Sequence, residues 1–233
     1  MAKIIGNVVG MPSPPQETGI SWDDIQNGGN RESYKGAFAE WGVEEIIPKH
    51  KVEPTDASQE LFYNCKKLKR IDKNKFDLSK AEYHPTDETQ TTATRLCYMC
   101  SELEVFPDIG LQAGHYWQTF LQCTKLHTVE ILRVAENVEF GTTAFRRCTN
   151  LRNITIEGTI GTSINFVQCP SLSVESIKNI ITHLKQYPNN ATYKPEVAFN
   201  PTAFSFLAAE GATSPNGNSW ADYVGDLGWT LSA

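Results

Sequence analysis

The sequence predicts an α/β solenoid, a short stack of about five to six coils with a helical and strand cap at its C-terminal end. Three observations predict this fold. One ten-residue pattern recurs along the middle of the chain, its copies follow one another at similar spacings, and an apolar stripe of helical period comes after the last copy. We expect an extended N-terminal arm over residues 1–30, repeats with an N-terminal cap over 31–172, and a C-terminal cap over 173–233.

The repeated unit is Phe-x-x-Cys-x-x-Leu-x-x-(Ile/Val/Phe). Copies begin at Phe62, Cys97, Phe120 and Phe145, and a shortened fifth copy begins at Phe166. Their cysteines are separated by 35, 23, 25 and 21 residues, and all but the first spacing are typical of leucine-rich repeats. A unit of this length cannot bury its apolar face alone, so we expect the units to stack with each Phe on the next Phe and each Leu on the next Leu.

The repeat cysteines should form an internal column of buried free thiols, because cysteine is small and readily buried. Cys97 and Cys100 have the spacing of a metal or redox pair, which is the alternative interpretation. However, Cys97 takes the place that Phe holds in the other units, and no second Cys or His pair completes a zinc set. We therefore predict a core role for Cys97, with no metal and no cofactor.

A strand should follow each repeat leucine, with alternating side chains directed inward. The inward set would include Val129, Ile131, Ile154 and Ile156, which leaves the residues between them on the solvent face. This face is our candidate site for a ligand or receptor, although a mixed-charge face can also be simply solvated. Its residues are Arg70, Asp72, Thr128, Glu130, Asn153 and Thr155. The long first spacing leaves room for a further degenerate coil at 76–79 and a polar loop at 84–94.

Both ends of the stack should be covered by caps. Ser173 is placed to cap a helix whose apolar face runs from Val174 to Leu184. A strand near 192–197, a helix at 220–226 and a last strand at 229–231 should follow, and 31–58 should cover the opposite end. The arm is either a disordered terminus or an anchor that becomes ordered on a partner. Its candidate docking residues are Ile4, Ile5, Val8, Val9, Pro12, Pro14 and Pro15.

The Phe-x-x-Cys-x-x-Leu-x-x-Ile unit resembles the BspA-type leucine-rich repeat over about residues 31–233, and residues 3–15 are similar to the N-terminal arms of phage fibre and decoration proteins. The resemblance implies a non-enzymatic virion accessory protein, a head or tail fibre or a decoration. Its arm would dock to a phage capsid or tail protein, and its repeats would bind host surface glycan or protein. A homotrimer is a candidate assembly. The alternative is a bacterial cell-surface adhesin of the BspA type.

Composition and motifs argue against several other classes of function. A net charge of −6 argues against nucleic acid as a partner, and no stretch is apolar enough to span a membrane. The first ten residues do not have the apolar core of a signal peptide, so we expect assembly in the host cytoplasm and location on the virion. The five histidines have no metal spacing, and no nucleophile or phosphate-loop motif occurs. We expect no catalytic residues, and an enzyme that uses the 84–94 loop is the remaining alternative.

Overall fold

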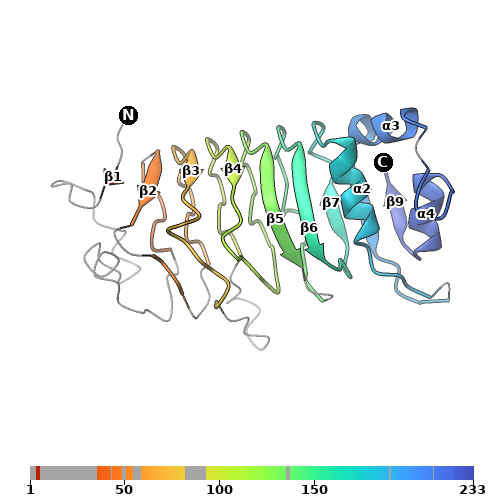
Figure 1. Ribbon diagram of the computed structural model, residues 1–233, viewed down its shortest axis with the longest axis horizontal. Helices are drawn as coiled ribbons and strands as arrows, with labels where there is room; N and C mark the ends of the chain where they lie inside the picture. The colour runs from red at the N-terminus through yellow and green to blue at the C-terminus, as the bar shows by residue number, and fades with distance from the viewer. Residues whose placement is uncertain are drawn as a thin grey trace.

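The computed structural model describes residues 4–5, 36–42, 44–48, 51–54, 59–81, 93–134, 137–188, 190–211 and 213–233. The elements lie in one elongated row, from β1 near the N-terminus to α3 and α4 at the other end (Figure 1). Neighbouring strands of each sheet are parallel. The first sheet contains β1 (Ile4–Ile5), β2 (Glu45–Ile47) and β3 (Arg70–Ile71). The second contains β4 (Val105–Phe106), β5 (Thr128–Val134) and β6 (Asn153–Gly158).

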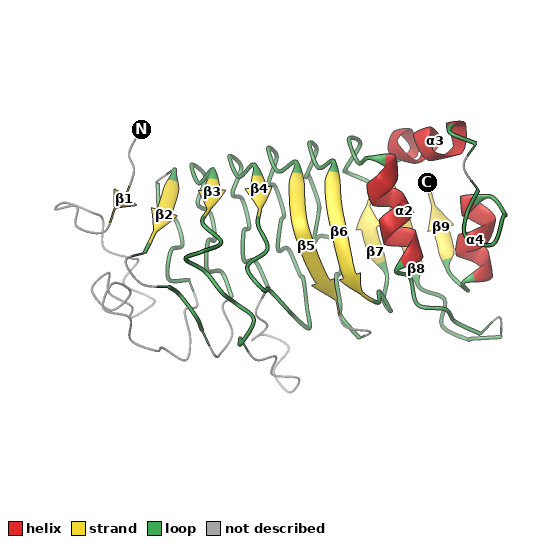
Figure 2. Ribbon diagram, in the orientation of Figure 1, coloured by secondary structure: helices red, strands yellow, loops and turns green. Residues whose placement is uncertain are grey.

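The third sheet contains β7 (Ile164–Phe166), β8 (Glu196–Phe199) and β9 (Thr230–Ser232). Three helices lie at the same end of the row: α2 (Val174–Thr182), α3 (Pro201–Ala209) and α4 (Trp220–Asp226) (Figure 2). The combination of parallel strands and helices is the α/β class that the sequence predicts.

The repeat phenylalanines stack ring on ring through the core, as predicted. The ring centroid of Phe145 lies 5.5 Å from that of Phe120 and 4.8 Å from that of Phe166. The column extends into both segments for which we expected caps, because Phe38 stacks on Phe62 at 5.8 Å and Phe199 on Phe166 at 6.0 Å. The repeat packing therefore continues beyond the units that the sequence pattern marks.

All six cysteines are free and buried, which confirms the predicted thiol column. Five of the thiols donate a hydrogen bond to a main-chain carbonyl one unit earlier in the stack, four of them to the phenylalanine that begins that unit and one to Cys97. Burial raises the pKa of four of them, Cys65, Cys123, Cys148 and Cys169, since a thiolate is poorly solvated in an apolar core. The donor–acceptor pairs are Cys65–Phe38, Cys100–Phe62, Cys123–Cys97, Cys148–Phe120 and Cys169–Phe145.

The turns around each Phe and Cys are not regular helices, because residues in them adopt the left-handed conformation. In four units the residue directly before the cysteine has a positive φ, and in three units so does the residue two places before the Phe position. Each such residue carries a cost of about 1–2 kcal/mol, which the surrounding packing offsets. They are Asn64, Met99, Gln122 and Arg147 in the first set and Glu60, Arg95 and Gln118 in the second.

Two details of the predicted repeat differ in the structure. Ile131 is half-buried rather than inward, because the pairing of β5 with β6 shifts by a residue between Val129 and Leu132, and Leu132 takes the core position. Phe76 forms an isolated parallel β-bridge with Val52, and its ring centroid lies 5.2 Å from that of Phe62. It belongs to the return side of the first unit rather than to the additional coil that we expected.

Helix α2 closes the edge of the second sheet, where it contacts β6. Ser173 caps the helix as predicted, by accepting a hydrogen bond from the Ser176 amide. Ser176 Oγ accepts a hydrogen bond from the Ile154 amide at 3.0 Å, and Asn179 Oδ1 accepts one from the Ile156 amide at 2.7 Å. The helix side chains thus occupy the place of a next strand and satisfy donors that an open sheet edge would leave free.

The C-terminal elements match the sequence reading in kind and differ in extent. The expected strand at 192–197 is β8 at 196–199, the helix at 220–226 is α4, and the last strand is β9 at 230–232. Helix α3 was not predicted, although Asn200 caps it and Pro201 begins it.

Candidate ligand-binding face of the repeat sheet

Parallel pairing places the predicted binding residues of β5 and β6 on one face of the second sheet. Thr128 pairs with Asn153 and with Val105, so these residues form one row across β4, β5 and β6. The residue that follows each of them in its strand, Phe106, Val129 or Ile154, is buried. By contrast, Arg70, Asn153 and Thr155 are exposed. The remaining three candidates, Asp72, Thr128 and Glu130, are half-buried. All six side chains therefore reach solvent from the sheet.

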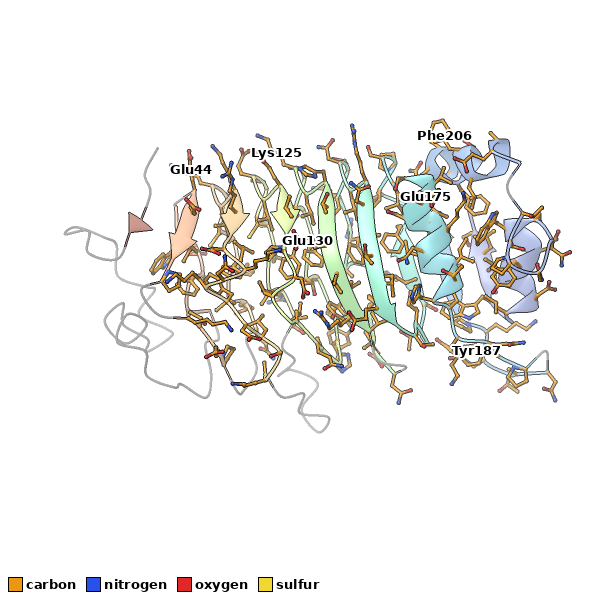
Figure 3. The ribbon with its side chains drawn as sticks, in the orientation of Figure 1. Glu44, Lys125, Glu130, Glu175, Tyr187 and Phe206 are labelled. Atoms are coloured by element: carbon orange, nitrogen blue, oxygen red, sulfur yellow. The ribbon has the colours of Figure 1, made fainter. Side chains whose placement is uncertain are left out.

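A hollow of about 300 Å³ is lined by only three of these six residues. Arg70, Asp72 and Glu130 line it, whereas Thr128, Asn153 and Thr155 do not. The hollow lies over β3, β4 and β5, and Glu130 is labelled near the middle of the row in Figure 3. The other residues that line it are not among the predicted site residues, although the run of charges from Lys69 to Lys73 is a usable signal. These residues are Lys69, Ile71, Lys73, Glu104, Val105 and Pro107.

Two of the acidic residues of the hollow, Glu130 and Asp72, already have structural partners. Glu130 Oε2 accepts the Asp108 amide at 3.0 Å and lies 3.6 Å from Lys73 Nζ. Asp72 Oδ1 accepts the Asn74 amide at 2.9 Å. By contrast, Arg70 is exposed and forms no ion pair with another residue in the described part of the chain. Arg70 is therefore the cation of this hollow that a ligand can engage at the least cost.

A second group of charges follows Pro107, outside the residues that line the hollow. The Arg133 guanidinium donates to both Asp108 carboxylate oxygens, one of them at 3.0 Å, and lies 3.5 Å from Glu157. Hydrogen bonding to Arg133 lowers the pKa of Asp108, so this carboxylate stays ionised. The hollow itself holds three basic side chains, Lys69, Arg70 and Lys73, and three acidic ones, Asp72, Glu104 and Glu130. Such a balanced surface favours polar, hydrogen-bonding partners over a polyanion.

No group of three or more His, Cys, Asp or Glu side chains that could hold a metal occurs among the described residues. None of the described helices is long and apolar enough to cross a membrane. Of the predicted docking residues, Ile4 and Ile5 form β1 and pair with Ile46 and Ile47 of the same chain. Val8, Val9, Pro12, Pro14 and Pro15 lie outside the described residues, as do positions 84–92 of the loop predicted at 84–94.

Comparison with known families locates the repeat independently. The family model described as "BspA type Leucine rich repeat region" matches residues 115–198 in six copies. The comparison with curated proteins gave no match, and the comparison with solved structures gave none. The matched residues include β5, β6, β7 and α2. They support the BspA-type leucine-rich-repeat family that the Phe-x-x-Cys-x-x-Leu units indicate, and a repeat of this type suggests a surface, adhesin-like protein.

Proposed function

We propose that this chain is a non-enzymatic binding protein whose repeats form a solenoid of about five to six coils and present the sheet face to a surface glycan or protein. The observation that carries the proposal is the hollow beside Arg70, where an exposed cation lies next to Lys69, Lys73 and Glu130, which already have ion-pair partners. A scaffold of stacked repeats is suited to this role, because it holds side chains from several units in one rigid row.

The arrangement of acids supports binding rather than catalysis. Glu130 accepts a main-chain amide, and Asp72 accepts one as well. Asp108 is held ionised by Arg133. A carboxylate whose pKa is lowered, as that of Asp108 is, is a poor general acid near neutral pH, since proton transfer needs a group with a pKa near the working pH.

The setting that we propose is a phage virion, with assembly in the host cytoplasm. Residues 1–30 would dock to a capsid or tail protein, which leaves the repeats displayed toward the host. The similarity of residues 3–15 to the arms of phage fibre and decoration proteins supports this setting. The second candidate is a bacterial cell-surface adhesin, which the match to the BspA-type repeat favours.

Charge reversal at Arg70 tests the binding face. Arg70→Glu should weaken adsorption of the purified chain to host cells by about tenfold or more, which corresponds to about 1.4 kcal/mol. Arg147→Glu is the matched control, because Arg147 is also exposed but lies in a turn before Cys148. Both variants should keep the melting temperature of the parent. Equal adsorption of Arg70→Glu and the parent would refute the sheet face as the binding surface.

Purified particles test the setting. Cryo-electron microscopy of virions from the producing strain should show density for the repeats, with residues 1–30 against a capsid or tail protein. Particles without the chain, together with its detection on intact cells free of phage, would replace the virion by the adhesin.

A further inference from the structure

A second hollow lies on a different part of the stack from the sheet face. It has a volume of about 400 Å³ and is formed by segments that precede the Phe turns, together with the chain that leads into β8. Two exposed aromatic side chains line it, Trp117 at 36% exposure and Tyr193 at 53%. Its other lining residues are Glu139, Phe140, Gly141, Thr142, Thr162, Ser163, Ile164, Asn165 and Glu196.

Trp117 is held in place although much of it faces solvent. Its ring meets the His115 ring edge-on at 5.1 Å. Gly141 lies against the indole, and a Cβ at this position would be 3.2 Å from Trp117 Cδ1. Gly141 also has a φ of +58°, which L side chains rarely adopt. Glycine at position 141 therefore leaves room for the Trp117 indole, which the Cβ of any other residue there would crowd.

Tyr193 is supported by a chain of aromatic contacts. Its ring lies edge-on to Tyr187 at 6.2 Å, and Tyr187 in turn lies 6.2 Å from Trp229. Tyr187 is labelled in Figure 3, in the segment between α2 and β8. Large exposed aromatic side chains that share one hollow commonly mark a binding site.

The polar side chains of this hollow are acceptors and hydroxyls, with no lysine or arginine among the residues that line it. Glu139 Oε2 lies 3.2 Å from His115 Nδ1. Glu196 accepts a hydrogen bond from the Ser232 hydroxyl. These neighbours orient the two carboxylates, which can accept hydrogen bonds from ligand hydroxyls. The hydroxyls of Thr142 and Ser163 and the amide of Asn165 add donors and acceptors.

We propose that this hollow, called here the Trp117–Tyr193 pocket, binds an uncharged oligosaccharide. A sugar ring presents an apolar C–H face, which packs on an aromatic ring, and a rim of hydroxyls, which carboxylates and amides recognise. The two glutamates and the lack of a lining cation exclude sugars that carry a carboxylate, because like charges repel across a partly desolvated site. The inference rests on the proposed binding role of the chain, but it places a ligand on a surface separate from the hollow at Arg70.

Saturation-transfer NMR with the full chain tests the pocket, using lactose, maltotriose and chitotriose as neutral probes. At least one of them should bind, and Trp117→Ala and Tyr193→Ala should each weaken it by about tenfold or more. Phe206→Ala is the matched control, because Phe206 is 57% exposed on α3 and does not line the pocket. Sialyl-lactose, which carries a carboxylate, should bind more weakly than lactose.

Three results would overturn the assignment: no binding of any neutral probe, equal loss in Phe206→Ala, or full binding by both pocket variants. Binding of apolar peptides in place of sugars would also overturn it and would make the pocket a protein-docking site. The test is separate from that of the sheet face. Trp117→Ala that keeps cell adsorption but loses sugar binding supports both sites, whereas Arg70→Glu that keeps adsorption refutes only the sheet face.

Discussion

Truncation of Phe145 measures how much the phenylalanine column contributes to stability. Phe145 is 1% exposed, and its ring lies between those of Phe120 and Phe166. Replacing a buried phenylalanine with alanine costs about 3–5 kcal/mol. The two ring contacts favour the upper half of that range, since each such contact contributes about 0.5–1.5 kcal/mol beyond area burial. A loss of about 4 kcal/mol is a large share of the roughly 5–15 kcal/mol that stabilises an ordinary domain.

Guanidinium unfolding, followed by circular dichroism, gives the change in free energy from the midpoint and slope. Phe206→Ala serves as the control, because its side chain is 57% exposed and its removal should change stability by less than about 0.5 kcal/mol. A loss below about 1 kcal/mol for Phe145→Ala, or one equal to that of the control, would refute the stacked core.

Two further predictions concern pH and close packing. Burial raises the pKa of Cys169 from 9.0 to about 12, so its contribution to stability is complete below pH 9 and should be lost as the pH rises toward 12. Alkaline unfolding curves of Cys169→Ala should fall less steeply, and identical curves would contradict the shift. Gly158→Ala should cost about 2 kcal/mol or more, since its Cβ would lie 2.0 Å from the Val134 carbonyl oxygen. Gly225→Ala is the control, because a Cβ at this position would have no neighbour within 4 Å, and thermal melts should show a gain in stability of about 0.5–1 kcal/mol. A Gly158→Ala variant as stable as the parent would contradict the close pairing of the strands.

The sequence predicts the core columns well, because Phe, Cys and Leu recur at fixed offsets and stacking follows from that recurrence. It predicts the ends of the columns less well. Phe38 and Trp41 hold the Phe and Cys positions of an earlier unit, but Glu44 stands where the pattern requires leucine. The sequence therefore predicts a cap at this end rather than a further repeat unit. The shift that buries Leu132 depends on the pairing of β5 with β6, which a single strand does not encode.

The two candidate binding surfaces differ in the same way in how far the sequence predicts them. Alternation along the strands places Arg70, Asp72 and Glu130 on the outer face, and the hollow that joins them depends on how three units pack. The Trp117–Tyr193 pocket was not predicted, since its two aromatic residues are 76 positions apart and meet only when the chain is stacked. An exposed tryptophan before a repeat phenylalanine is the single sequence feature that could have pointed to it.

Hydrogen exchange of the chain with and without envelope fragments from the cells to which it adsorbs tests whether the repeat sheet is the binding face. We expect bound fragments to slow exchange in peptides covering 69–73, 104–108 and 128–134, while peptides from α4 exchange as in the free chain. Unchanged exchange in all three of these segments, under conditions in which the fragments remain bound, would contradict the claim that the repeat sheet is the binding face.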